Sequence, residues 1–322
     1  MTTTSGSTGE PLFIFGSKEA VEAEIETECA VLDYFGVTEN DVVLSLIGLG
    51  SRRAPVFHAA CGRRGVPVLP LGAWNTTSVE RTLSVIERVR PTVWFGITSY
   101  VMKILDRIGP ECVPRCIPAG GEQLLNYHIR KCRDREIEVY NQMGAAECGT
   151  FAVSRNKNLN RMEVIAKGVY VETVEIEAGD ALVVTDLNNF AMPIVRYVTG
   201  DIVKDVRHND DGSVKEFTVD RREDDALVLN GWRASKFDIV SKLSDYAQDF
   251  IVYIKAVGGV DTVEIVLPEN CRAKEKEIIE ALKEVHAEKY IVLRDGIIVP
   301  KTTTGKHKYV VDLRGLARRA AP

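Results

Sequence analysis

The sequence predicts an α/β protein with a layered, mostly parallel sheet, an added antiparallel β segment and a small α+β domain at its C-terminal end. Three observations predict this fold. Strand-like and helix-like runs alternate up to about residue 140, strand-like runs separated by turns follow residue 150, and a β-β-α-β order begins near residue 222. A chain of 322 residues favours two domains, which we place at 1–221 and 222–322.

In the first half, apolar residues at helical spacing predict helices, and short β-branched and apolar runs predict strands. The predicted helices are 18–34, 54–63, 77–88, 99–108 and 123–135, and the strands are 12–15, 41–49, 66–70, 92–95, 116–119 and 137–140. Alternation of this kind is typical of a parallel sheet covered by helices.

The second half changes character. Strands are predicted at 164–176, 181–185, 194–197 and 202–206, and Asn209-Asp-Asp-Gly212 is a hairpin signal that favours antiparallel pairing. In the small domain the predicted helices are 237–246 and 274–286, and the strands are 250–257, 262–267, 290–293 and 296–299.

The composition is that of an ordinary globular protein, with 45% hydrophobic and 27% charged residues. The net charge of −5 is spread over mixed charges, so we expect neither nucleic acid nor membrane as a partner. The start of the chain lacks the features of a signal peptide, and a cytoplasmic location is the default expectation. Seven cysteines without a ligand-like spacing are interpreted as buried free thiols.

The segment that opens the chain, Thr4-Ser5-Gly6-Ser7-Thr8-Gly9-Glu10-Pro11, is rich in glycine and small hydroxyl residues. Backbone N–H groups and hydroxyls of this kind suit a polyphosphate. It is not a Walker loop, because GxxxxGK[ST] is absent. Taken alone, the segment is more typical of a flexible polar tail.

Four later segments change that interpretation. They are Tyr140-Asn141-Gln142-Met143-Gly144-Ala145-Ala146-Glu147, Tyr197-Val-Thr-Gly-Asp201, Arg222-Glu-Asp224-Asp and Pro300-Lys-Thr-Thr-Thr-Gly-Lys306. Together with the opening loop they resemble, in order, the motifs of the adenylate-forming enzymes (TSGSTGxP, YGxTE, YxTGD, RxDD and P[KR]TxxGK). Ala119-Gly120-Gly121-Glu122, and Thr98-Ser99-Tyr100 after a strand, are similar to the phenylacetate–coenzyme A ligase branch.

The resemblance implies a role for each segment. The opening loop, from Thr4 to Gly9, would bind phosphate. Gly120, Gly121 and Glu122, the stretch from Tyr140 to Met143, Asp201 and Arg222 would contact the rest of the nucleotide. Glu147 would bind magnesium, Asp224 would be the hinge to the small domain, and Lys306 would be the catalytic lysine. Tyr100, Phe95 and Gly144 are the candidate acid-pocket residues.

The chemistry agrees with the resemblance. A carboxylate that attacks the α-phosphate brings two anions together, so the reaction needs a metal and a positive charge. Glu147 offers hard oxygen ligands to Mg²⁺, and Lys306 is a compact point charge that can bridge the carboxylate and the α-phosphate. Asp201 can accept two hydroxyl protons from a ribose diol.

The sequence departs from the family pattern at its start and in the segment 140–147. Family members carry a segment before the phosphate loop, and without it we expect a homodimer or a partner that supplies the segment. Ala146 replaces Thr or Ser, and Met143 replaces an aromatic residue. His58, Arg52 and Arg53 fall near the stretch where the family builds its acid pocket, but we expect the arginines at the surface.

The sequence therefore predicts an ATP- and Mg²⁺-dependent ligase. It would activate an aromatic or other small carboxylic acid as an acyl-adenylate and transfer the acyl group to a thiol. The thiol would belong to coenzyme A or to the phosphopantetheine of a carrier protein. The alternative is a non-catalytic, nucleotide-binding or partner-binding remnant of the family.

Overall fold

The structure is a computed structural model, and it describes residues 2–3, 13–48, 51–73, 76–122, 124–154, 158–301 and 307–314. The chain forms two compact units. Unit 1 comprises Met1–Leu124 and Lys131–Arg221, and unit 2 comprises Leu125–Arg130 and Arg222–Pro322. None of the described helices is long and apolar enough to cross a membrane.

Unit 1 is built on one eleven-stranded sheet in the order β10-β11-β12-β13-β9-β8-β7-β6-β5-β3-β4. Its parallel part consists of β3 (Val43–Leu46), β4 (Val68–Pro70), β5 (Val93–Ile97), β6 (Cys116–Gly120) and β7 (Glu138–Ala145). A short pair, β1 (Thr2–Thr3) and β2 (Phe13–Ile14), stands apart from this sheet. The predicted parallel sheet is confirmed.

One helix precedes these strands and three connect them up to β6, and serine caps fix where two of these four helices begin. Ser17 accepts a hydrogen bond from the backbone N–H of Ala20, and Ser78 accepts one from that of Arg81. These side chains satisfy N–H groups that have no partner within the first helical turn. The helices are α1 (Lys18–Tyr34), α2 (Arg53–Arg63), α3 (Val79–Val89) and α4 (Thr98–Leu105).

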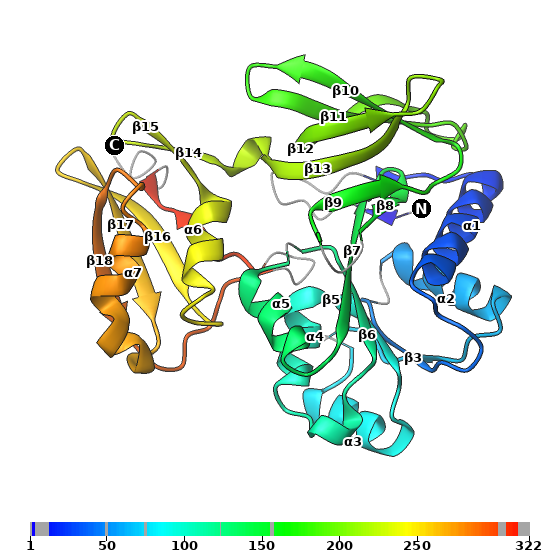
Figure 1. Cartoon of the computed structure of the whole chain (residues 1–322), viewed down its shortest axis with the longest axis horizontal. Coiled ribbons are helices and arrows are strands. Elements are labelled where there is room, and N and C mark those ends of the chain that lie inside the picture. The colour runs from blue at the N-terminus through cyan, green and yellow to red at the C-terminus, as the bar shows by residue number, and fades with distance from the viewer. Residues whose placement is uncertain are drawn as a thin grey trace. The chain divides into compact units, whose positions relative to one another are not determined.

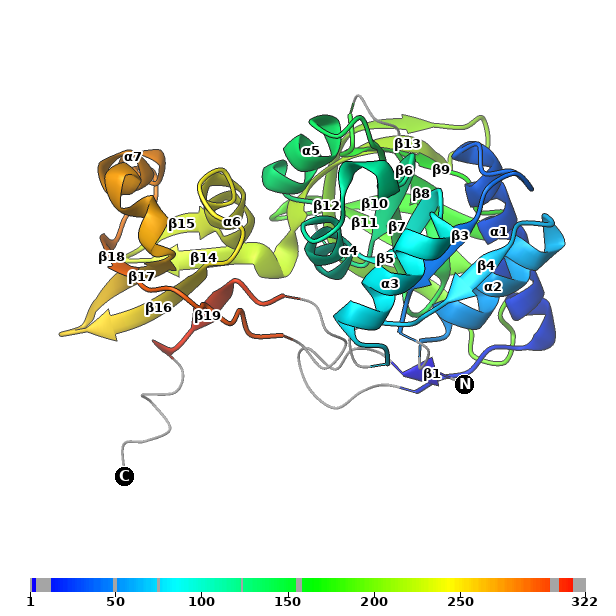
Figure 2. The ribbon, with the colours of Figure 1, turned by 90° about the horizontal axis from the view of Figure 1, so that it is seen from below.

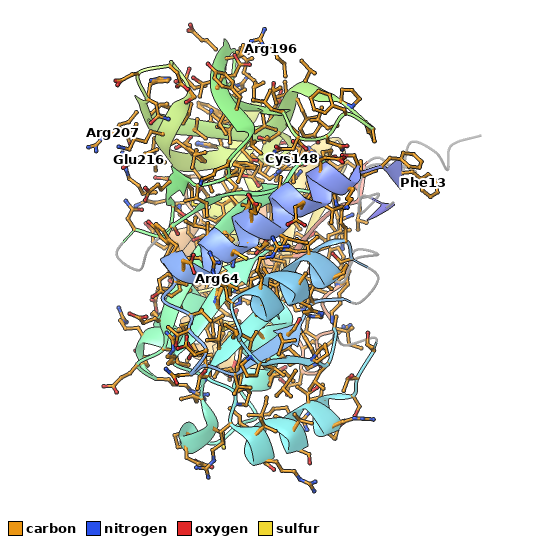
Figure 3. The ribbon with its side chains drawn as sticks, turned by 90° about the vertical axis from the view of Figure 1, so that its right-hand side faces the viewer. Phe13, Arg64, Cys148, Arg196, Arg207 and Glu216 are labelled. Carbon is orange, nitrogen blue, oxygen red and sulfur yellow. The ribbon has the colours of Figure 1, made fainter. Side chains whose placement is uncertain are left out.

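Helices cover both faces of the parallel strands. Figure 3 shows α1 and α2 side by side across one face, where Phe57 and Phe35 enter a core with Val43 and Phe95. Alternate residues of the same strands, such as Leu44 and Trp94, point the other way and are also fully buried. Apolar side chains of α3 and α4 are buried as well, so the sheet is the middle layer of three (Figure 2).

The antiparallel part extends the same sheet (Figure 1). Its strands are β8 (Gly149–Val153), β9 (Arg161–Val164), β10 (Val169–Ile176), β11 (Gly179–Asp186), β12 (Ile194–His208) and β13 (Val214–Arg222). The predicted hairpin at 209–212 is confirmed by the hydrogen bond from Asn209 N to Ser213 O. The prediction of separate strands at 194–197 and 202–206 is wrong, because β12 continues through Gly200 at φ 81°.

Unit 2 has its own sheet in the order β18-β17-β16-β19 and its own core, which includes Leu243, Phe250, Leu267 and Ile278. Its elements are β14 (Ala226–Leu229), β15 (Trp232–Ser235), α6 (Lys236–Leu243), β16 (Ile251–Val257), β17 (Val260–Leu267), α7 (Glu275–Ala281), β18 (Glu288–Leu293) and β19 (Val310–Asp312). Helix α5 (Asn126–Arg133) carries residues of both units.

Two expectations for this unit are wrong. No strand forms at 296–299; the place beside β16 is taken by β19, which pairs with it in parallel. The predicted helix 274–286 is shorter, because the 3-10 turn Glu269–Lys274 precedes α7 and the helix ends at Ala281.

Candidate active site

The carboxyl ends of β5, β6 and β7 meet at one edge of the sheet, where ligands bind in open α/β folds. Gly120 pairs with Ile97 on one side and with Gln142 on the other. Gly121 follows with φ 77°, in the left-handed region that favours glycine. Glu122 then accepts a 2.8 Å hydrogen bond from the backbone N–H of Ser99, in the first turn of α4. This bond fixes the loop that carries the two glycines.

Tyr140 does not occupy the position that the sequence suggested. It is 5% exposed, and its ring stacks on Phe35 with centroids 4.4 Å apart. Its hydroxyl donates to Glu138 Oε2 at 2.6 Å. The ring therefore lies in the core under α1, and its expected contact with a nucleotide stays a prediction.

The rest of the segment lies nearer to the end of β7. The side-chain amide of Asn141 donates to Leu159 O at 3.1 Å. Gln142 is buried, and Met143 packs against the core of the antiparallel part. Gly144 sits at a register shift between β7 and β8, where a Cβ atom would lie 2.5 Å from Gly149 O. Only a residue without a side chain fits that approach.

Glu147 lies in the turn after β7, and one hydrogen bond joins it to β12. The hydroxyl of Tyr197 donates to Glu147 Oε1 at 3.1 Å. These residues belong to two different motifs of the sequence. Asp201 lies further along β12, and its backbone N–H donates to Thr199 Oγ1 at 3.2 Å. The fold thus brings the expected metal ligand into contact with the motif that carries the expected ribose ligand.

The described residues contain no group of three or more His, Cys, Asp or Glu side chains that could hold a metal ion. Magnesium usually keeps several waters, and its other ligands are substrate phosphates and one or two protein carboxylates. A cluster of acidic side chains is therefore not required. Glu147 is half-buried, and Tyr197 engages one of its two oxygens. The other oxygen fits a single-carboxylate magnesium site.

In unit 2, Arg222 Nε donates to Asp224 Oδ1 at 3.0 Å, and Lys236 Nζ donates to Asp224 O at 2.6 Å. Asp225 accepts from Phe237 N at 2.8 Å and anchors the start of α6. The roles expected for Arg222 toward the nucleotide and for Asp224 as a hinge stay predictions. Thr4, Ser5, Gly6, Ser7, Thr8, Gly9 and Lys306 lie outside the described residues.

The candidate pocket residues Phe95 and Tyr100 are both buried. Phe95 stacks on Phe57 with centroids 3.9 Å apart, and the Arg53 guanidinium lies 4.8 Å from the Phe95 ring centroid. The hydroxyl of Tyr100 is buried and has no hydrogen-bond partner within the described part of the chain.

The expectation that Arg52 and Arg53 lie at the surface is wrong. Their side chains are 14% and 28% exposed, and each faces a glutamate of α1. Arg52 pairs with Glu24, and Arg53 Nε lies 3.5 Å from Glu28 Oε1. Burial raises the pKa of the Glu24 carboxyl to about 7, although Arg52 acts against that rise. One feature of the sequence could have predicted these pairs. Glu24 and Glu28 are four residues apart, so they lie on one face of α1, where both can meet positive side chains.

The fold has clear counterparts among solved structures. A 2-hydroxyisobutyryl-CoA ligase in the postadenylation state matches 99% of this chain and 74% of its own, with a TM-score of 0.80 and 16% identity. The O-succinylbenzoate coenzyme A synthetase of Bacillus subtilis, solved with ATP and magnesium, matches 96% and 68% with a TM-score of 0.66 and 18% identity. The fold is therefore that of the adenylate-forming enzymes.

In sequence, the chain is 20% identical over 344 residues to a phenylacetate-coenzyme A ligase of Aromatoleum evansii, a match that covers 96% of this chain and 77% of that protein. No protein-family model matches the chain. In sequence the chain is therefore similar to the phenylacetate–coenzyme A ligase branch, and in fold it is similar to coenzyme A ligases that form adenylates.

Proposed function

We propose that this protein is an acid–thiol ligase that works through an acyl-adenylate. A carboxylate oxygen of the acid attacks the α-phosphorus of ATP, and the bond to pyrophosphate breaks. A thiolate then attacks the acyl carbonyl carbon, and AMP leaves with the electron pair of the broken C–O bond. Coenzyme A is the favoured thiol, because the similar proteins are coenzyme A ligases.

The observation that carries this proposal is the 3.1 Å hydrogen bond from Tyr197 to Glu147. It joins two segments that are 50 residues apart and that were singled out separately as nucleotide motifs. Chance resemblance of short motifs would not place them in contact on a fold shared with enzymes of the same chemistry.

The residues of this chain then have distinct tasks. Bound magnesium would neutralise phosphate charge, with Glu147 as its protein ligand. Asp201 accepts ribose hydroxyls, and the loop at Gly120 and Gly121 lets backbone approach the nucleotide. Lys306 supplies positive charge as the carboxylate and α-phosphate meet. Rotation of unit 2 about Asp224 would exchange Lys306 for a thioester-forming surface.

Pyrophosphate exchange tests the proposal. The folded protein is incubated with ATP, Mg²⁺, labelled pyrophosphate and a panel of aryl and short-chain acids. Acid-dependent exchange that Glu147→Gln abolishes is the expected result. Exchange with none of the acids, together with calorimetric binding of ATP, would instead support the non-catalytic remnant.

The thiol acceptor is identified by the second half-reaction. Acyl-adenylate formed on the protein is offered coenzyme A or a phosphopantetheinylated carrier protein, and thioester is measured by mass spectrometry. We expect coenzyme A to be acylated, and acylation of the carrier protein alone would overturn that choice.

We also propose that the protein associates with a second copy of itself. Large apolar side chains are exposed on unit 1, including Phe13, Leu187, Phe190 and Val195. Asn189, next to Phe190, donates to Phe15 O at 2.8 Å, which connects the segment of Phe190 to that of Phe13. Figure 3 shows Phe13 pointing away from the ribbon. Light scattering at micromolar concentration tests this, and a thermally robust monomer would contradict it.

A further inference from the structure

Several buried polar atoms around Arg53 have no hydrogen-bond partner among the described residues. They are Arg53 Nε, Gln142 Nε2 and Glu28 Oε2. Buried polar atoms are almost always paired, and each unpaired one costs roughly 1–3 kcal/mol. Two unpaired donors beside an unpaired acceptor are therefore a feature that needs an explanation.

These atoms belong to one connected group at the carboxyl edge of the sheet. Arg53 Nη2 donates to Gln142 Oε1. Glu28 Oε1 accepts a 2.7 Å hydrogen bond from Thr150 Oγ1 and lies 3.5 Å from Arg53 Nε. Glu28 and Gln142 are 3% and 6% exposed. The group thus combines α1, α2, β7 and β8 at the place where parallel strands present their ligands.

One nitrogen of the Arg53 guanidinium, Nη1, faces the end of β6. A Cβ atom at Gly120 would lie 3.2 Å from Arg53 Nη1, so this nitrogen stands directly over the end of β6. Nη1 has no hydrogen bond in the described part of the chain, and the side chain is 28% exposed. Below it the guanidinium rests on the ring of Phe95. The guanidinium is held on one side and can donate on the other.

A purely structural ion pair does not account for this arrangement. The neighbouring pair, Arg52 and Glu24, is in direct contact. Arg53 and Glu28 are 3.5 Å apart at Nε, without a hydrogen bond, and the second oxygen of Glu28 is unpaired. A direct hydrogen bond would stabilise this pair further, because buried charges gain most from such bonds.

Three kinds of group on the substrate acid can be compared by how well each would pair these atoms. A hydrocarbon tail would leave all of them unpaired. A second carboxylate could accept from Arg53, but it would meet the unpaired carboxylate oxygen of Glu28 and be repelled. A hydroxyl can accept from Arg53 or Gln142 and donate to Glu28 at the same time.

We infer that the acid activated by this protein carries a hydroxyl group, and that Arg53, with Gln142 and Glu28, recognises it. This inference rests on the proposed function, because it assigns the substrate class of the same site. Arg53 is then a specificity-determining residue, and it has no part in the transfer of the acyl group.

The test compares acids that differ in one substituent. Pyrophosphate exchange is measured with 2- and 3-hydroxyisobutyrate against isobutyrate, with 2- and 4-hydroxyphenylacetate against phenylacetate, and with methylmalonate as the dicarboxylic probe. We expect at least one hydroxy acid to exceed its parent acid by at least about 100-fold in kcat/KM, because a site built to bind a hydroxyl rejects an acid without one by up to about 10⁴–10⁵-fold. Methylmalonate should be no better than isobutyrate.

Three variants connect that preference to Arg53. Arg53→Met removes the donors and should reduce the preference to about tenfold or less, by lowering kcat/KM for the hydroxy acid more than that for the parent acid. Arg53→Lys keeps the charge that faces Glu28 but loses the planar fork, so it should fold normally and still lose most of the preference. Arg64→Met is the control, because Arg64 follows the same helix and pairs with the exposed Asp33.

The outcomes separate the two proposals. Exchange with hydrocarbon acids or methylmalonate in preference to every hydroxy acid would overturn the inference and leave the ligase function standing. A preference that survives in folded Arg53→Lys and Arg53→Met would also overturn it. Exchange with no acid at all would overturn both.

Discussion

Gly144 gives the sharpest prediction about the geometry of the site, because its backbone lies unusually close to the neighbouring strand. A Cβ atom at this position would lie 2.5 Å from Gly149 O and 2.9 Å from Thr150 Cα. Both contacts are to backbone, so no side chain can rotate away. Ordinary contact begins at about 3.4 Å, and Gly144→Ala must therefore push β7 and β8 apart by about 0.9 Å.

Overpacking of this kind costs about 1–3 kcal/mol. In a unit of roughly 200 residues, each kcal/mol lowers Tm by about 2–4 °C, so we expect a loss of about 2–12 °C. The displaced strand carries Thr150, and the same turn carries Glu147. We therefore also expect the KM for ATP in pyrophosphate exchange to rise.

Gly62→Ala is the matched control. Gly62 lies in α2, and a Cβ atom there would have no atom within 4 Å. Alanine at such a position stabilises a helix by up to about 1 kcal/mol. Differential scanning fluorimetry and exchange kinetics compare the two variants. A Gly144→Ala protein with the Tm and the KM of wild type would refute the close approach of β7 and β8.

Four further predictions follow from single groups. Tyr197→Phe removes a hydrogen bond to a charged group, worth about 1.5–3 kcal/mol, and should raise the half-saturating Mg²⁺ concentration in exchange about tenfold or more; an unchanged magnesium titration would contradict this. Burial raises the pKa of the Asp41 carboxyl, but hydrogen bonds led by that of Arg115 outweigh it and lower the pKa to about 2. Because the folded pKa is depressed, this group contributes about 2 kcal/mol of stability above pH about 4 that is lost as pH falls toward 2, so Asp41→Asn should unfold with a shallower pH dependence in that window. All seven cysteines are free and buried, so Ellman's reagent should label none rapidly in native protein and seven in guanidinium; fast native labelling would count against the fold. Lys306→Ala should slow acyl-adenylate formation by several orders of magnitude and thioester formation from supplied acyl-adenylate much less, and equal losses would refute a two-conformation mechanism.

Local pattern was enough to predict most elements of unit 1. The predicted helix at 18–34 is α1, and the strand at 116–119 lies within β6. Both have strong local signals: the serine cap and helical periodicity in α1, and a short apolar run before glycines in β6. The motifs, and with them the resemblance to the adenylate-forming enzymes, could also be predicted from the sequence, because they depend on residue type and order alone.

Only the tertiary structure decided what each side chain faces. Tyr140 belongs to a nucleotide-like motif, yet its ring lies in the core against Phe35. Arg52 and Arg53 were expected at the surface, but α1 brings two glutamates over them. Burial of a charge depends on a partner distant in sequence, and periodicity within one element contains no information about that partner.

The same reason explains the errors in unit 2. The run at 296–299 is as apolar as a strand, but a strand exists only where a neighbour offers free N–H and C=O groups. The edge of β16 is occupied by Val310–Asp312 instead. Sequence by itself therefore determined the elements, their order and the motifs they carry, because these are local properties. The tertiary structure decided which strands pair and which polar groups meet in the candidate site, because pairing and burial are settled between segments that lie far apart along the chain.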